Sequence, residues 1–218
     1  MLKWPLQLFD IRRRFFRNLK NPERILEIGC GSGYNVKALH LLYPDAKITG
    51  LDLFDVSPLP AYAIYEKVDL DLGRLPFPTG HFDAVVITHV LEHLQRPLEL
   101  APEITRVLRK GGLVYCETPN WTSLFVPSFG FKRLQQGPLN FYDDPTHLKP
   151  WSVQGLFNYV HQSCGIKVVR AGVVRNIPKL LFDPFILLSG LILGRRPYIL
   201  SVVWNVVGWA IFAIGRKE

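Results

Sequence analysis

The sequence predicts an α/β fold of the doubly wound type, in which a mostly parallel sheet carries helices on both faces. Short apolar runs typical of buried strands alternate with helical patterns from residue 24 onward. A glycine-rich stretch, GCGSG, separates the first of these strands from the first helix, and Asp52 ends the next strand. Because parallel strands need a crossover between them, this alternation favours a parallel sheet.

The individual elements follow from local patterns. Strands are predicted over 24–29, 47–52, 83–88 and 112–118, with a short third strand before Asp69, and helices over 35–43 and 98–110. A helix over 152–164 and a strand over 165–174 follow a loop-like stretch rich in glycine, proline and aromatic residues after Pro119, which we expect to cover the substrate. In such sheets ligands bind outside the carboxyl ends of the strands, which indicates where the chemistry lies.

The N-terminal segment, residues 1–20, is predicted to be a basic amphipathic helix. It interleaves leucine, phenylalanine and isoleucine with Arg12, Arg13, Arg14 and Arg17. Such a helix could lie on an anionic membrane surface, or it could pack its apolar stripe on the rest of the domain. Both interpretations stay open at this point.

A hydrophobic segment, residues 178–207, precedes the C-terminus. One interpretation makes Tyr198 to Gly215 a single membrane helix. We favour the other, a hydrophobic helical insertion that ends near Gly208 and is followed by a last strand over 208–217, because glycine breaks the helix and the residues after it suit a strand. The insertion is expected to meet a membrane, the substrate or another subunit, the last as a homodimer.

Length and composition limit the number of domains and the kinds of partner. With 218 residues the chain is expected to form one domain, 1–218, with its core in residues 21–175. The net charge of +8 favours an anionic partner. The three cysteines lack paired spacing, and the N-terminus lacks a secretory signal pattern, so we expect a cytoplasmic protein that associates with membranes through 1–20 and 178–207.

The acidic residues around the glycine stretch indicate a cationic ligand. Tyr34 stands where a dinucleotide fingerprint would need glycine, so the spacing is G-x-G-x-G. Glu27 precedes the first glycine, where a carboxylate would repel a pyrophosphate and favour an ammonium or sulfonium group. Asp52 is placed to accept hydrogen bonds from two ribose hydroxyls, although it could instead cap the following turn.

At this point the sequence resembles the class I S-adenosylmethionine-dependent methyltransferases, especially those related to ubiquinone-pathway and glycan or lipid O-methyltransferases. The resemblance rests on ILEIGCGSG, GLD, LPFPTGHFDAVV, HVLEHL, VLRKGGLVYCETPN and DPTHLKPWS, over roughly residues 24–175. It implies a Rossmann-like fold with a seven-stranded sheet and S-adenosylmethionine as cofactor. The implied cofactor-binding residues are Glu27, Gly29, Cys30, Gly31, Gly33, Asp52, Leu53, Asp69, Leu70, Asp71, Thr88 and His89. Either Asp69 or Asp71 would meet the adenine.

Three histidines are candidate catalytic residues. His89, Glu92 and His93 form an H-x-x-E-H arrangement, one spelling of zinc-peptidase sites. Because the predicted strand runs to Thr88, His89 falls at a strand-to-helix junction, and no downstream helix offers an obvious third ligand, so no metal site is predicted. The resemblance implies instead that His89 faces the cofactor while Glu92 and His93 orient the loop or touch the substrate. His147 could take the proton of an acceptor hydroxyl, or it could simply fasten its loop.

The predicted function is methyl transfer to a small-molecule, glycan or lipid-linked acceptor, on oxygen. The net charge also prompts nucleic-acid methylation, but TPN at residues 118–120 is not the N/D-P-P-Y/F motif that grips a base amino group, so a nucleic-acid partner is not expected. Tyr34 argues against a nicotinamide-dependent reductase. A protein that binds S-adenosylmethionine without catalysis stays an alternative.

Overall fold

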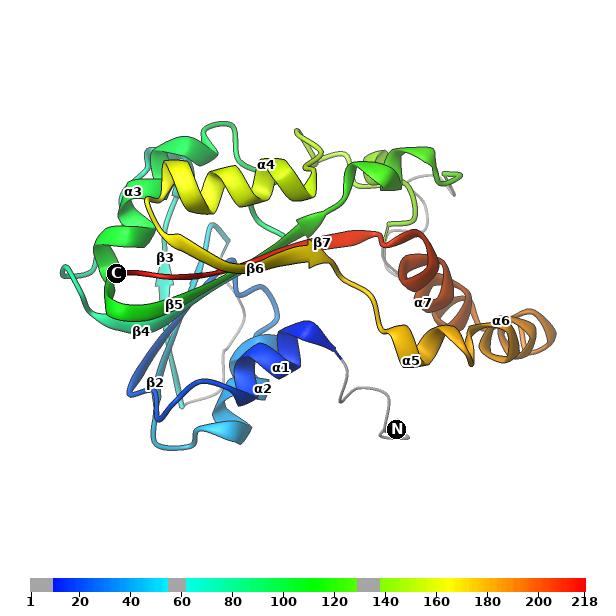
Figure 1. Cartoon of the computed structure of the whole chain (residues 1–218), viewed down its shortest axis with the longest axis horizontal. Helices are drawn as coiled ribbons and strands as arrows, with labels where there is room; N and C mark the ends of the chain where they lie inside the picture. The colour runs from blue at the N-terminus through cyan, green and yellow to red at the C-terminus, as the bar shows by residue number, and fades with distance from the viewer. Residues whose placement is uncertain (1–9, 55–61, 129–137) are drawn as a thin grey trace.

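A twisted sheet with helices on both faces forms the centre of the protein, as the sequence predicts (Figure 1). The computed structural model describes residues 10–54, 62–128 and 138–218. The strands are β1 (Arg24–Ile28), β2 (Lys47–Asp52), β3 (Ala63–Lys67), β4 (Phe82–Thr88), β5 (Leu108–Pro119), β6 (Lys167–Val173) and β7 (Ala210–Arg216). Their order is β3-β2-β1-β4-β5-β7-β6, and β7 runs antiparallel to both of its neighbours.

The helices divide between the two faces. Helices α1 (Ile11–Arg17) and α2 (Tyr34–Leu42) cover one face, where Phe16, Val36 and Leu39 are buried against β1 and β2. Helices α3 (Pro97–Val107) and α4 (Val153–Asn158) cover the other, with Leu100 and Leu156 in its core. This two-sided burial explains why the central strands are apolar almost throughout.

A helical extension lies at one end of the sheet (Figure 1). It consists of α5 (Ile177–Leu180), α6 (Asp183–Ile192) and α7 (Arg196–Val207), and α7 stops at Gly208, which has a left-handed φ of +64°. Because a Cβ at Gly208 would lie 2.3 Å from Val173 Cγ1, the chain needs glycine there to turn back into β7. The predicted helical insertion followed by a last strand is confirmed. Within the described residues no helix is long and apolar enough to cross a membrane.

Several predicted boundaries were wrong. The helix over 98–110 ends at Val107, since Arg109 and Lys110 already belong to β5. The helix over 152–164 divides into α4 and a π-helical turn over Tyr159–Ser163. No helix starts directly after β4, because α3 begins only at Pro97, so the LEHL residues lie in a turn.

The N-terminal helix is also shorter than expected. Residues 1–9 lie outside the described part of the chain, and α1 covers only Ile11–Arg17, with its first N–H groups capped by the Asp10 carboxylate. Its apolar side chains Ile11, Phe15 and Phe16 are buried against the domain. The apolar stripe of α1 is therefore occupied by packing and is not available to a membrane.

Candidate functional site

The glycine stretch wraps around the carboxyl ends of β1 and β2. Gly29, Gly31 and Gly33 all have left-handed φ angles, of +73°, +46° and +72°. A Cβ on Gly29 would lie 2.1 Å from Val90 Cγ2, whereas a Cβ on Gly31 would meet nothing within 4 Å. Gly29 therefore lets the loop pack against the turn after β4, and Gly31 leaves an open space beside bare backbone. The Cys30 side chain belongs to the hydrophobic cluster on the α1 and α2 face of the sheet, and burial raises the pKa of its thiol to about 12.

Glu27 supplies a buried carboxylate next to this loop. Its side chain is 1% exposed, and Oε1 accepts a 2.6 Å hydrogen bond from the Asn35 amide. Burial raises the Glu27 pKa to about 7, against the lowering effects of the Asn35 hydrogen bond and the Arg12 charge. Oε2 has no hydrogen-bond partner among the described residues. An incomplete buried carboxylate of this kind fits a ligand that brings a positive charge and hydrogen-bond donors.

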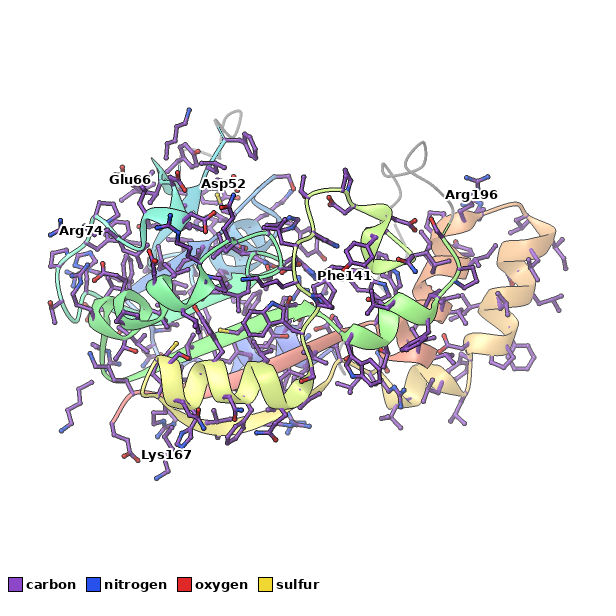
Figure 2. All side chains as sticks on the ribbon, turned by 90° about the horizontal axis from the view of Figure 1, so that it is seen from above. Asp52, Glu66, Arg74, Phe141, Lys167 and Arg196 are labelled. Carbon is purple, nitrogen blue, oxygen red and sulfur yellow. The ribbon has the colours of Figure 1, made fainter. Side chains whose placement is uncertain are left out.

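Asp52 ends β2 (Figure 2), and its carboxylate contacts the glycine loop. Oδ2 accepts the Gly31 N–H at 2.8 Å and Oδ1 accepts the Phe54 N–H at 3.2 Å. Each oxygen keeps a second lone pair for a ligand hydroxyl. The neighbouring Leu53 side chain is 47% exposed.

The two aspartates after β3 differ in what they contact. Asp71 is partly buried, and its Oδ1 accepts the Arg96 backbone N–H at 2.9 Å. Asp69 is exposed, and its Oδ1 accepts the Asp71 N–H at 3.0 Å. The Leu70 side chain between them belongs to the hydrophobic core. Asp71 is thus part of the scaffold that holds the turn before α3, and Asp69 is the carboxylate that faces outward.

Thr88 and His89 leave the carboxyl end of β4. The Thr88 hydroxyl accepts a 3.0 Å hydrogen bond from the same Asn35 amide that binds Glu27. His89 has a left-handed φ of +55°, which is unusual for a residue with a Cβ and typical of functional turns. Its Nε2 lies 3.3 Å from Glu117 Oε1 and its Nδ1 lies 3.3 Å from Glu92 Oε1. Burial lowers the His89 pKa, but these two carboxylates outweigh it and raise the pKa to about 9.

A buried charge network behind His89 was missed by sequence reasoning. Arg12 points inward from α1, and its guanidinium binds the Glu117 carboxylate through Nε at 3.2 Å and through Nη2. The Tyr115 hydroxyl donates to the same carboxylate. Arg12 also reaches Asn35 Oδ1 at 3.4 Å. The sequence did contain a signal, because Glu117 stands inside an otherwise apolar strand, and a buried carboxylate needs a charged or hydrogen-bonding partner.

His93 and His147 lie together on the other side of Glu92. Their ring centroids are 4.7 Å apart, although the residues come from the turn after β4 and from the segment before α4. His147 is 7% exposed, its Nδ1 contacts the Phe141 carbonyl at 2.6 Å, and burial lowers its pKa. The structure thus brings together two of the three predicted catalytic histidines, while His89 faces the opposite side of the same glutamate.

A large cavity opens next to His89 and Glu117. Its volume is about 640 Å³, and it extends from the end of α1 along the extension formed by α5, α6 and α7. Apolar side chains such as Phe182, Ile186 and Trp204 line its far part. His89 lines its near part, whereas His93 and His147 do not. The cavity therefore starts at the carboxyl end of β4, which is next to the strand that carries the glycine loop, and its far part is apolar.

The strand order, the antiparallel β7 and the glycine loop next to Glu27 and Asp52 define a class I, Rossmann-like methyltransferase fold. Solved structures support this. An S-adenosylmethionine-dependent methyltransferase from Archaeoglobus fulgidus aligns with a TM-score of 0.64 at 22% identity, over 97% of this chain and 94% of its own. Phosphoethanolamine N-methyltransferase 2 of Haemonchus contortus, in complex with S-adenosyl-L-methionine, aligns with a TM-score of 0.66 at 16% identity, over 99% of this chain and 53% of its own.

The sequence comparisons go beyond the fold. Residues 3–169 match the family described as a methyltransferase domain, and the chain belongs to this family, which uses S-adenosylmethionine as methyl donor. A ubiquinone biosynthesis O-methyltransferase of Nitrosococcus oceani is 26% identical over 163 residues, 66% of this chain and 68% of that protein. A malonyl-[acyl-carrier protein] O-methyltransferase of Legionella pneumophila is 32% identical over 126 residues, 50% of this chain. The chain spans 38–42% of the length of this and other curated relatives that it matches.

Proposed function

We propose that this protein transfers the methyl group of S-adenosylmethionine to an oxygen atom of an amphiphilic small molecule. The observation that carries the proposal is the cavity of about 640 Å³, which begins at His89 beside the predicted cofactor site and continues into the apolar extension. A pocket of this size suits one ligand with a long apolar part. Two of the relatives named above are O-methyltransferases, which supports oxygen as the accepting atom.

The cofactor arrangement follows from the contacts around the glycine loop. Glu27 would receive the ammonium group of the methionine part, because its Oε2 is buried and lacks a partner. The bare backbone of Gly29, Cys30, Gly31 and Gly33 would allow the ligand to approach closely. Asp52 would bind the ribose hydroxyls, with Leu53 alongside.

For the adenine we assign Asp69 rather than Asp71. Asp71 already holds the Arg96 backbone, whereas Asp69 is exposed and its second carboxylate oxygen is not involved in the turn. The buried Leu70 side chain fixes the turn that presents Asp69. Thr88 and His89, at the end of β4, would border the transferred methyl group.

The protein would contribute mainly by alignment. Methyl transfer is an in-line displacement, and correct positioning of the reactants can supply roughly 7–11 kcal/mol of the barrier reduction. Each ring nitrogen of His89 lies 3.3 Å from a carboxylate oxygen, Nε2 from Glu117 and Nδ1 from Glu92, so neither nitrogen is free to take a proton from the acceptor. His89 would therefore orient the acceptor and hold the turn rather than accept a proton. His147 stays a predicted acceptor-side residue.

A direct assay tests the proposal. Labelled S-adenosylmethionine is incubated with hydroxylated acceptors that share a head group and differ in apolar chain length, and methylated product is measured. Ser201 lines the cavity, so Ser201→Phe should fill it and raise KM for the long acceptor, while cofactor affinity by calorimetry stays unchanged. Ser201→Ala is the matched control. Equal KM values for long and short acceptors in the unmodified protein would contradict the assignment, and absence of cofactor binding would contradict the activity itself.

We also propose that this enzyme acts at an anionic membrane surface. Four apolar side chains of α6, the α6 apolar face, are 57–73% exposed: Phe185, Leu188, Leu191 and Ile192. Arg195 and Arg196 lie at the start of α7, and Figure 2 shows Arg196 at the edge of this extension. Phe185 also lines the cavity. Apolar side chains with adjacent positive charge suit anionic lipid, and an acceptor with a long apolar tail could enter the cavity from there.

A further inference from the structure

Three side chains with metal-binding groups converge on the side of Glu92 that faces away from His89. Glu92, His93 and His147 each offer one ligand atom, and these atoms lie within 4.8 Å of one another. His147 comes from a segment that returns to Glu92, where the Leu148 N–H donates to the Glu92 carbonyl at 2.8 Å. The two parts of the cluster are therefore fixed to each other by backbone hydrogen bonds.

Both imidazole rings are oriented through their Nδ1 atoms. His147 Nδ1 lies 2.6 Å from the Phe141 carbonyl, and His93 Nδ1 lies 2.8 Å from the Thr146 hydroxyl and 3.3 Å from the Thr146 carbonyl. A metal-binding histidine typically donates one ring N–H to an oxygen of the protein and coordinates through the other nitrogen. In this arrangement neither Nε2 atom makes a hydrogen bond within the described residues, and His147 Nε2 lies 3.9 Å from Asp144 Oδ2.

Glu92 provides a carboxylate that the protein itself leaves incomplete. Its side chain is fully buried, and Oε2 accepts a 2.9 Å hydrogen bond from the Thr118 hydroxyl. Oε1 makes no hydrogen bond within the described residues, and His89 Nδ1 lies 3.3 Å from it. The His89 ring offsets part of this buried charge, and an oxygen that makes no hydrogen bond can still bind a cation.

We propose that Glu92, His93 and His147 bind a divalent transition-metal ion. Two imidazole nitrogens and one carboxylate oxygen suit zinc and related first-row ions, whereas magnesium prefers oxygen ligands. The sequence pattern led us to expect no metal, because His89 and His93 are poorly placed to share one ion. The tertiary structure replaces His89 by His147, which lies 54 residues beyond His93 in the chain and is adjacent to it in space.

The site is connected to the proposed acceptor cavity through Glu92. Its effect on methyl transfer rests on the proposed function, whereas metal binding itself does not. Three protein ligands leave an open coordination position, which a water molecule could take. Glu92 links the site to His89, and His89 lines the acceptor cavity. A metal ion here would share the Glu92 carboxylate with His89 and so change the charge next to the acceptor cavity.

The test uses the full chain after dialysis against a chelator. Zinc is titrated in competition with a chromophoric chelator, and the cobalt-substituted protein is examined by visible absorption for nitrogen and oxygen coordination. We expect about one equivalent per chain, and roughly tenfold or greater loss of affinity in Glu92→Gln, His93→Ala and His147→Ala. His161→Ala, an exposed histidine outside the cluster, is the matched control and should bind normally.

Folding and cofactor binding are followed in parallel. Circular dichroism and S-adenosylmethionine calorimetry show whether each variant is intact, and the less buried His93→Ala keeps the test informative if Glu92→Gln fails to fold. Equal zinc affinity in unmodified protein, His93→Ala and His147→Ala would overturn the proposal. Metal binding without methyl transfer to any acceptor would leave this site standing and contradict the proposed function instead.

Discussion

Arg12 of α1 and Glu117 of β5 form an ion pair that joins residues 105 positions apart in the sequence. The side chain of Glu117 is 3% exposed and that of Arg12 is 22% exposed. The pair fastens the N-terminal helix to the edge of the sheet where the cofactor is expected. Because Glu117 also receives the Tyr115 hydroxyl and faces His89, Arg12 holds together a charged cluster next to the cavity.

Replacing Arg12 should therefore destabilise the protein more than a surface arginine would. Arg12→Met leaves the Glu117 carboxylate buried without its cation, and we expect the free energy of unfolding in urea to fall by about 3 kcal/mol. Arg17→Met removes the same charge from an exposed position of the same helix and should change it by less than about 0.5 kcal/mol. The double variant Arg12→Met/Glu117→Gln should recover much of the loss. Equal effects at positions 12 and 17 would disprove the structural role of the pair.

Cofactor affinity should depend on pH through Glu27. Its pKa is raised from 4.5 to about 7, chiefly by burial, so it is largely protonated in the free protein below pH 7. A ligand with a positive charge requires the ionised form. We expect the affinity for S-adenosylmethionine, measured by calorimetry, to rise between about pH 5.5 and 7.5, below the range where the ligand's own α-amino group deprotonates.

Glu27 also makes the stability of the free protein depend on pH, but stability falls with rising pH where cofactor affinity rises. Without ligand, the folded protein binds more protons at Glu27 than the unfolded chain between pH 4.5 and 7, so the contribution of Glu27 to stability decreases as pH rises through that window. Glu27→Gln should remove both dependences and bind the cofactor weakly at every pH. A Glu27→Gln protein with the affinity and pH profile of the unmodified protein would exclude Glu27 from the cofactor site.

Two glycines with left-handed φ angles allow the effect of a substitution on stability to be distinguished from its effect on cofactor binding. Gly31 and Gly165 both have left-handed φ angles, +46° and +64°, and a Cβ at either position would meet nothing within 4 Å. Alanine should therefore cost about 1–2 kcal/mol of stability at each. Only Gly31→Ala should weaken S-adenosylmethionine binding, since its added methyl group enters the space proposed for the ligand. Similar cofactor dissociation constants for the two variants would contradict that placement.

Membrane binding should depend on the α6 apolar face. We expect the full chain to float with vesicles containing anionic phospholipid and to bind zwitterionic vesicles weakly, with less binding at high salt. Leu188→Glu/Leu191→Glu should abolish flotation, because it places charge on the face proposed to enter the lipid. Leu41→Glu changes an exposed leucine of α2, outside the α6 apolar face, and should leave flotation intact. If both variants float as well as the unmodified protein, the α6 apolar face is not the membrane-binding surface.

Much of the fold and the glycine loop could be predicted because local patterns encode them. Alternating strands and helices specify a parallel sheet, and glycine at positions 29, 31 and 33 allows backbone angles that other residues avoid. Gly208 ended a helix for the same reason. Errors arose where packing overrides propensity, as at the end of α3, where the chain passes directly from helix into β5.

The sequence by itself determined the order of the elements, the glycine loop, Asp52 and the break at Gly208, since each depends on conformations that neighbouring residues impose. Only the tertiary structure decided that Arg12 turns inward to Glu117, that His147 joins Glu92 and His93, and that a cavity extends from His89 along α6 and α7. These contacts join segments far apart in the chain, and they depend on strand order and on where each loop returns. No local period carries that information, because side-chain direction toward a distant partner is set by packing of the whole domain.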